Sequence, residues 1–431
     1  MAFCHAFTRL LIAALLVYTP AFAKGKSKTS RQQHQPATAT SAEEPATPLS
    51  PPPTQATPEI KKIRVLLDEF DLADDPHLVI QGKHDSILSC PAEENEGVLF
   101  EGENINILCA ENRLYLQCSD GKHRRLKHNS LEIANPHHRL TVGGKTYHGN
   151  IIIRLDEENK KVLIINKVPL EDYVCSVVRY ECVPTWPFEM QKLQAIISRT
   201  YAAYQMTLAR SSHPFYKYYD IRNTNLHQVY NGTHTLTRIR QAVEETQDLV
   251  LTYNGKIALT MFDICCGGSV PALMRCKDTT KPYLMRSQKC IYCPQSQHYR
   301  WQLDLHHKTF LDKLLADAAT KQKLDGIKQI KEIKVVDADK AGVVHKVSIV
   351  GTNNKRVLLS GRDIRRPLSI RVRSLNYTIK KINDRIVIQG KGDGHQKGVC
   401  QVGCRELLKR GWSMQRVLQF YYPGTALSRL V

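Results

Sequence analysis

The chain has 431 residues, of which 42% are hydrophobic, so it is long enough for more than one domain and has the apolar residues for a buried core. This composition excludes a wholly disordered protein. The formal net charge of +20 favours acidic partners and is also common in proteins that bind nucleic acid. No RNA- or DNA-binding motif accompanies the charge, so we expect no nucleic-acid partner, and a solvated basic surface is the simplest interpretation.

The N-terminus has the features of a secretory signal over residues 1–23. Arg9 precedes the apolar run 10–17, and the segment 21–23 supplies small residues for cleavage. The run is too short to span a bilayer, so we expect no membrane span in the mature chain, with a retained signal-anchor as the weaker alternative. Residues 24–58 are rich in Pro, Thr and Ala and cannot bury enough surface to fold, which predicts a disordered linker. We therefore predict export, to the periplasm or cell envelope.

A pattern of short strands begins at residue 63. The runs are apolar or alternating and are bounded by Gly, Asp and Asn, which is typical of β-strands. We expect an α+β fold, with a β-rich N-terminal lobe over residues 59–140 that leads into a mixed α/β domain with a helix-lined cleft over residues 141–431. The predicted strands are 63–67, 77–80, 104–108, 113–117, 149–155 and 161–166.

The stretch 170–205 predicts two helices joined by a turn. Apolar residues recur at helical spacing on both sides of Pro184, and acidic residues occupy the first turn, where the helix dipole favours them. Pro184 disfavours a helical conformation at Val183, so the first helix must end near that residue. The second apolar stripe then predicts a second helix.

Glu181 lies at the end of the first predicted helix. Its sequence neighbours are Val183, Trp186 and Pro187, and a carboxyl group among such residues can stay protonated near neutral pH, as a general acid must. A solvated glutamate at a helix end is the alternative interpretation, because most glutamates are of that kind.

These residues resemble the SpoIID/LytB family, whose motif is close to LEDY-x-x-x-VV-x-x-E-x-x-x-x-WP-x-E-A-x-K-x-QA-x-A-x-RTYA. The resemblance covers most of the chain from about residue 63 to the end and makes 141–431 a SpoIID-type catalytic domain. The matching residues are Leu170 to Tyr173, Val177, Val178, Glu181, Trp186, Pro187, Glu189, Lys192, Gln194, Ala195, Arg199, Thr200, Tyr201 and Ala202.

Two further segments resemble the same family. A Gln-Val-Tyr-x-Gly series begins at Gln228, and a glycine-rich segment near the end carries a histidine and a glutamine. The chain departs from the family pattern at several positions: Asp263 replaces a usual histidine, the pair 247–248 replaces a glycine, the pair 396–397 replaces Gly-Val, and Cys404 replaces an alanine. The candidate substrate-binding residues are Lys192, Arg199, Tyr201, Gln228, Tyr230, His395 and Gln401.

Structural alternatives exist for these candidates. Lys192 and Arg199 are seven residues apart, which places them on a similar helix face, where they could bind substrate carboxylates or form an exposed cationic face. A tyrosine at such a position is equally a core residue with a satisfied hydroxyl, and His395 is equally a structural histidine in a turn.

The resemblance implies action on bacterial peptidoglycan. Some members are lytic transglycosylases, and others are named as enhancers of a wall amidase. For this chain it implies cleavage between MurNAc and GlcNAc with formation of anhydro-MurNAc ends, on glycan strands from which stem peptides have been removed. Glu181 would be the acid and base, with no catalytic cofactor. The alternative is a non-catalytic peptidoglycan-binding protein that enhances a cell-wall amidase.

The cysteines predict one structural zinc. Residues 290–293 have the C-x-x-C spacing of a zinc knuckle, and the predicted ligands are Cys266, Cys276, Cys290 and Cys293. Export makes disulfides an equally open alternative. Cys400 and Cys404 are four residues apart on an expected helix face and are free to pair elsewhere.

Overall fold

The computed structural model describes residues 62–74, 77–82, 86–89, 98–100, 104–117, 123–126, 129–134, 139–211, 217–224, 227–275, 279–368 and 371–430. The predicted signal peptide, the predicted linker and Cys276 lie outside these ranges. None of the helices within them is long and apolar enough to cross a membrane.

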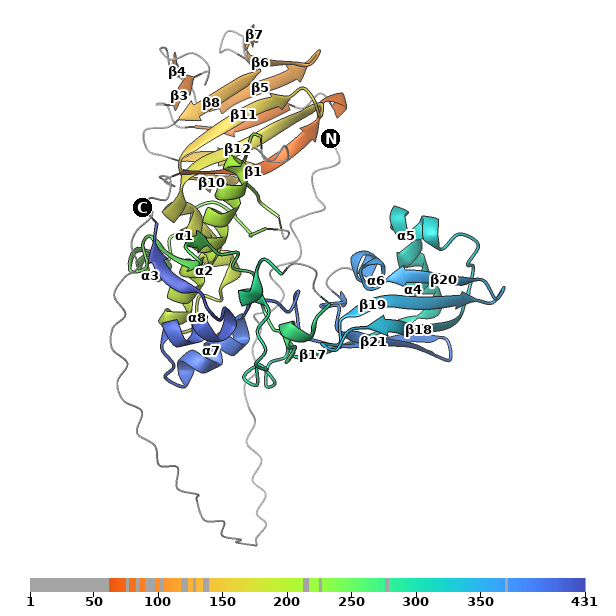
Figure 1. The fold of residues 1–431 in the computed structure, drawn as a ribbon. Helices are drawn as coiled ribbons and strands as arrows, with labels where there is room; N and C mark the ends of the chain where they lie inside the picture. Colours follow the sequence, from red (N-terminus) through yellow and green to blue (C-terminus); the bar gives the residue numbers. More distant parts are fainter. Residues whose placement is uncertain are drawn as a thin grey trace, which may run out of the picture. The chain divides into compact units, whose positions relative to one another are not determined.

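Two β-sheets form the N-terminal part of the described chain (Figure 1). The first contains, in spatial order, β13 (Ile221–Arg222), β1 (Lys62–Asp71), β12 (Lys161–Pro169), β11 (Asn150–Asp156), β8 (Ser130–Ala134), β3 (Ser86–Ser89) and β4 (Val98–Phe100). The second contains β10 (Lys145–Tyr147), β9 (Leu140–Val142), β2 (His77–Gln81), β5 (Asn104–Ala110), β6 (Arg113–Gln117) and β7 (His123–Arg125). A short 3-10 helix, η1 (Leu72–Asp74), follows β1. The predicted strands are confirmed.

The apolar pattern of each strand follows from the faces that it buries. In β5, Ile105, Ile107 and Cys109 are buried and alternate with more exposed residues, because only one face of this strand lies against the core. In β12 every residue from Val162 to Asn166 is buried, because the strand contacts core residues on both faces. A strand covered on both faces has a continuous apolar run instead of an alternating one.

The predicted helix pair follows β12 directly. α1 (Leu170–Glu181) ends before Pro184, and α2 (Phe188–Arg210) begins immediately after Pro187. The two helices pack against each other and against α3 (Thr237–Glu244), and α2 also contacts β14 (Leu249–Tyr253). The core that contains their apolar residues also includes the inward-facing residues of both N-terminal sheets.

The end of the chain returns to this helix pair. β14 pairs with β15 (Lys256–Ile257) and β24 (Ala426–Arg429), and β16 (Phe262–Asp263) pairs in parallel with β23 (Val399–Cys400). Two helices, α7 (Gln401–Lys409) and α8 (Met414–Tyr421), complete this part and both contact α2.

A separate α+β unit is inserted between β16 and β23. Its sheet contains, in spatial order, β17 (Arg300–His306), β22 (Arg385–Lys391), β21 (Tyr377–Ile382), β18 (Ile330–Ala338), β19 (Val344–Gly351) and β20 (Arg356–Ser360). Its helices are α4 (His307–Leu315), α5 (Ala318–Lys323) and α6 (Gly361–Leu368), and the 3-10 helices η3 (Pro271–Leu273) and η4 (Pro282–Leu284) precede it. This unit has its own hydrophobic core, so the described residues of 141–431 do not share a single core. The predicted α+β class is confirmed, and the boundary at residue 140 stays a prediction.

Candidate functional site

Glu181 is the last residue of α1, and its carboxylate is bound by a distant part of the chain. The backbone N–H of Val229 donates to Glu181 Oε1 at 2.7 Å. Burial raises the pKa of this carboxyl above its ordinary value, and the hydrogen bond from Val229 opposes that rise only in part. The group therefore favours its protonated form more than an exposed glutamate does.

The sequence neighbours that we expected to surround the Glu181 carboxyl group do so only in part. Val183 is 45% exposed and cannot shield the carboxyl group. Trp186 is partly buried, and the guanidinium of Arg405 lies over its ring at 5.3 Å. The hydrogen-bonding contacts of Glu181 come instead from Val229 and from the start of α7, which are far away in the sequence.

Gln401, the first residue of α7, contacts the backbone next to this carboxyl group. Its Nε2 donates to the carbonyl oxygen of Glu181 at 2.7 Å and to Gln194 Oε1 at 3.1 Å. The structure thus places the Gln401 side chain against the backbone of Glu181. The amide nitrogen is engaged with the protein, so Gln401 fixes the end of α1 in this conformation.

The segment that supplies Val229 is held by buried polar contacts on both sides. Gln228 Oε1 accepts a hydrogen bond from the hydroxyl of Tyr173 at 3.0 Å, and its Nε2 is a buried donor without a partner among the described residues. The Tyr230 hydroxyl donates to Asn166 Oδ1 at 2.6 Å. Tyr230 therefore has the satisfied hydroxyl of a core tyrosine, whereas Gln228 retains a free amide donor.

The cationic residues of α2 are already paired. Arg199 is fully buried, and its Nη2 and Nε donate to the carboxylate of Glu171 at 2.6 and 2.8 Å. Lys192 forms ion pairs with Glu189 at 3.3 Å and Glu245 at 3.2 Å. A contact between Arg199 and a substrate would require the buried pair to open, whereas the pairs of Lys192 include exposed carboxylates.

Tyr201 and His395 are the remaining predicted binding residues. Tyr201, on α2, is partly buried with its ring edge toward His227, at 6.3 Å between centroids. His395 is exposed, and its Nδ1 accepts a hydrogen bond from the N–H of Lys397 at 3.0 Å, so its proton is assigned to Nε2.

The glycines of the terminal motif serve protein contacts. Gly394 has φ +129°, and a Cβ there would lie 2.2 Å from the Cβ of Asp263. Asp263 replaces the usual histidine, is buried, and accepts a hydrogen bond from the N–H of Gln396. Burial raises the pKa of Asp263 well above its ordinary value. Because Gly394 has no Cβ, its loop can lie against Asp263.

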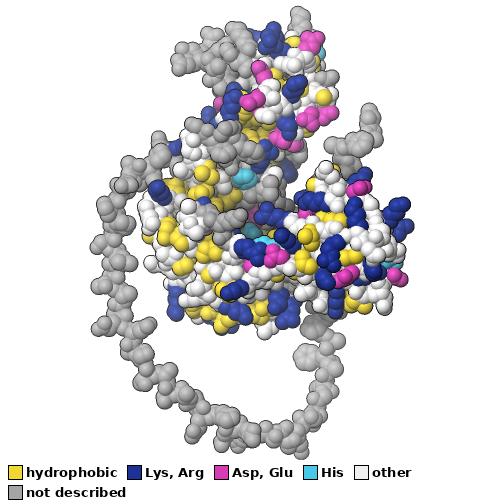
Figure 2. Space-filling model, turned by 45° about the vertical axis from the view of Figure 1, so that its right-hand side comes forward, with side chains coloured by type: hydrophobic (Ala, Val, Ile, Leu, Met, Phe, Trp, Pro, Cys, Tyr) yellow, Lys and Arg dark blue, Asp and Glu magenta, His cyan; other side chains and the backbone are white. Residues whose placement is uncertain are grey.

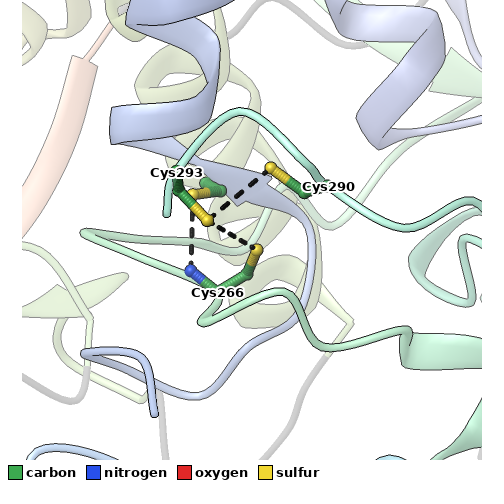
Figure 3. Close-up of side chains that lie close together, drawn as sticks. Cys266, Cys290 and Cys293 are labelled. Carbon is green, nitrogen blue, oxygen red and sulfur yellow. Dashed lines mark hydrogen bonds between the residues drawn. The ribbon is translucent and has the colours of Figure 1, made fainter. Parts of the chain in front are cut away.

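Four buried cysteines form a cluster that could hold a metal ion. The sulfur atoms of Cys266, Cys290, Cys293 and Cys400 all lie within 4.8 Å of one another. Figure 3 shows Cys266, Cys290 and Cys293 with their sulfurs turned toward one another. Three of the predicted ligands are thus brought together, the fourth, Cys276, lies outside the described residues, and Cys400 joins the cluster.

Cys400 was not predicted as a member of this cluster, because the sequence held no spacing signal for it. It is 134 residues from Cys266 and is the N-cap of α7. The sequence left its partner open, and the structure places its sulfur beside those of Cys266, Cys290 and Cys293. Its position directly before the motif glutamine Gln401 is the only hint that the sequence offers.

A second polar cluster lines a pocket beside α1 but does not form a nucleophile. Cys175 Sγ is 3.4 Å from His234 Nε2, a spacing typical of a thiol and its base. However, His234 Nδ1 accepts from the N–H of Leu236, so the proton lies on Nε2, which donates to the carbonyl oxygen of Cys175. Burial also raises the pKa of the Cys175 thiol to about 11. His234 cannot remove the thiol proton in this arrangement.

Comparisons with known proteins agree with this division of the chain. A family described as stage II sporulation protein (SpoIID) matches residues 158–253, and a domain of unknown function (DUF8618) matches residues 272–398, which contain the inserted unit. An uncharacterized protein of Brachyspira hyodysenteriae is 32% identical over 289 residues, which are 66% of this chain and 73% of that protein.

Two relatives from Bacillus subtilis carry functional names. Stage II sporulation protein D is 28% identical over 276 residues, which are 61% of this chain and 76% of that protein. The amidase enhancer is 26% identical over 378 residues, which are 78% of this chain but only 51% of the enhancer.

Proposed function

The chain belongs to the SpoIID family, and from this membership we propose that it acts on the bacterial cell wall as an exported peptidoglycan lytic transglycosylase. The proposal rests on one observation above all. Glu181 is a carboxyl group of raised pKa at the end of α1, held by a single backbone N–H. Such a group can deliver a proton near neutral pH and can take one back.

One carboxyl group is sufficient for this reaction. In the first step protonated Glu181 donates to the oxygen of the bond between MurNAc and GlcNAc, and this bond breaks. The carbon-six hydroxyl of the same MurNAc then attacks the anomeric carbon, and its proton returns to the Glu181 carboxylate. The Val229 N–H stabilises that carboxylate between the two steps. The products are one strand with an anhydro-MurNAc end and one with a free GlcNAc end, and the reaction uses neither water nor a catalytic cofactor.

The charge of the protein suits an anionic glycan. Figure 2 shows Lys and Arg side chains spread over the visible described surface, with Asp and Glu among them. The lactyl carboxylates of MurNAc are free once stem peptides have been removed, so we propose that such strands are the preferred substrate. Among the predicted binding residues, Gln228 has an amide donor without a hydrogen-bond partner among the described residues, but this donor is buried, so contact with a sugar hydroxyl would require the surrounding segment to open.

A second function is supported by one comparison. The similarity to the amidase enhancer covers most of this chain, although the chain spans only about half of that protein. Under this alternative the protein binds glycan strands and stimulates a cell-wall amidase without cleaving the glycan itself. Any zinc is structural in both cases and belongs to the cysteine cluster.

The two functions differ in their products. Purified glycan strands, with and without stem peptides, are digested with the protein, and the ends of the products are identified by mass. We expect anhydro-MurNAc ends, formed faster from strands without stem peptides. If the protein releases none but accelerates an added amidase, the enhancer function replaces the proposed enzyme.

A further inference from the structure

The four clustered sulfurs have the spacing of a metal site. Four sulfurs bound tetrahedrally to one zinc at about 2.3 Å lie about 3.8 Å from one another. In the structure Cys293 Sγ is 3.8 Å from Cys266 Sγ and 3.9 Å from Cys290 Sγ. Each of these separations is much longer than the roughly 2 Å of a disulfide bond.

Hydrogen-bond donors surround the sulfurs. The backbone N–H groups of Cys266 and Gly403 donate to Cys400 Sγ at 3.3 and 3.4 Å. The Tyr421 hydroxyl lies 3.2 Å from Cys290 Sγ. At Gly403 a Cβ would be 2.8 Å from Cys290 Sγ and 2.1 Å from the Tyr421 hydroxyl, so only glycine fits beside the cluster. Donors aimed at sulfur are the outer contacts that thiolate ligands need.

A buried cation next to the cluster has no carboxylate partner among the described residues. Arg286 is 2% exposed; its Nη2 donates to the carbonyl oxygen of Ser269 at 3.2 Å, and its Nε and Nη1 have no hydrogen-bond partner in the described part of the chain. Its guanidinium stacks on the ring of Tyr421 at 5.4 Å, and the hydroxyl of that tyrosine is the contact to Cys290. By contrast, the charge of Arg199, which is also fully buried, is compensated by the carboxylate of Glu171. An uncompensated buried charge is strongly destabilising, so Arg286 requires a negative group nearby.

A metal-bound cluster supplies this negative charge. We propose that Cys266, Cys290, Cys293 and Cys400 bind one zinc ion as four thiolates, and that Arg286 compensates the resulting charge. One Zn²⁺ and four thiolates carry a net charge of −2, and binding displaces the four thiol protons to solvent. No oxidant or reductant takes part, because zinc has a single stable oxidation state.

The position of the ligands gives the zinc a structural role. Cys266 follows β16 and Cys400 ends β23, so these two ligands flank the inserted unit in the sequence. Cys400 is also the N-cap of α7, directly before Gln401, which contacts the carbonyl oxygen of Glu181. The metal therefore joins both ends of the insertion and fixes the helix start that positions Glu181.

The test is zinc stoichiometry in the full chain purified without chelator under reducing conditions. We expect about one zinc per chain in the wild type. Cys400→Ser should contain almost none, whereas Cys404→Ser is the matched control, because Cys404 is an equally buried cysteine of α7 outside the cluster. Cys276→Ser should also keep its zinc.

Several results would overturn the proposal. Zinc lost from Cys276→Ser and kept in Cys400→Ser would make Cys276 the fourth ligand. A metal-free wild type would exclude the site, and stoichiometric iron would exclude zinc.

A measurement on the wild type covers the case in which Cys400→Ser does not fold. Zinc is replaced by Co²⁺, whose absorption reports both ligand type and geometry. We expect the intense thiolate-to-cobalt charge-transfer bands and the visible bands of a tetrahedral tetrathiolate site. A cobalt spectrum without them refutes the proposal.

Discussion

Replacing Glu181 by glutamine removes a transferable proton while preserving the shape of the side chain. The amide oxygen of Gln can still accept the hydrogen bond that the Val229 N–H donates at 2.7 Å. The cleavage rate should fall by about 10²–10⁴, the usual contribution of a general acid and base. Binding should survive, because the rest of the surface is unchanged.

Glu181→Gln should also change how the stability of the protein depends on pH. Burial raises the pKa of Glu181 above the 4.5 of the unfolded chain, so the folded protein binds this proton more tightly. Below pH 4.5 the carboxyl is protonated in both states, and its ionisation costs no stability. As pH rises through the folded pKa, ionisation of the buried carboxyl lowers the free energy of unfolding, by about 1.4 kcal/mol for each unit by which folding raises the pKa. Glu181→Gln has no such penalty, so its melting temperature relative to wild type should increase from pH 4 to pH 8.

The assay combines three measurements on one pair of proteins. Release of anhydro-ended fragments, pull-down on glycan strands and thermal unfolding across pH are compared for wild type and Glu181→Gln. The matched control is Glu158→Gln, the same change at an exposed glutamate between β11 and β12. The reasoning is refuted if Glu181→Gln cleaves as fast as wild type, or if its relative stability falls as pH rises.

Three further substitutions probe the contacts around the site. Gln401→Ala removes the donor to the Glu181 carbonyl and should cost about 1–3 kcal/mol in urea unfolding and slow cleavage; unchanged stability would contradict its positioning role. Arg286→Met should weaken zinc binding about 10- to 100-fold in a chelator competition, and equal affinity would exclude charge compensation. Glu171→Gln leaves the fully buried Arg199 without its carboxylate and should cost about 3–5 kcal/mol in urea unfolding; a cost below about 1 kcal/mol would mean that the pair is solvated.

Matched controls exist for each of these changes. Gln415 is an exposed residue of α8, so Gln415→Ala should leave stability unchanged. Arg275 pairs with Asp337 at the surface, so Arg275→Met should leave zinc affinity unchanged. Glu189 is exposed and its pair with Lys192 is only partly buried, so Glu189→Gln should cost about 0–1 kcal/mol.

The sequence by itself determined the local elements of this protein. Pro184 and the helical spacing of apolar residues were sufficient to predict α1, the turn and α2, with Glu181 at the junction. The β-strands and the C-x-x-C pair were predictable for the same reason. In each case the residues that decide the structure are a few positions apart, so their spacing is visible in the sequence.

Only the tertiary structure decided which groups meet at the site. The N–H of Val229 is 48 residues from Glu181, the amide of Gln401 is 220 residues from it, and Cys400 is 134 residues from Cys266. Arg199, which we predicted to bind substrate, is paired with Glu171, and this partner was not evident because it lies 28 residues away on another helix. No periodicity encodes such pairs. They form because the packing of α1, α2 and α7 into one core brings their polar groups together out of water, where each buried charge and donor needs a partner.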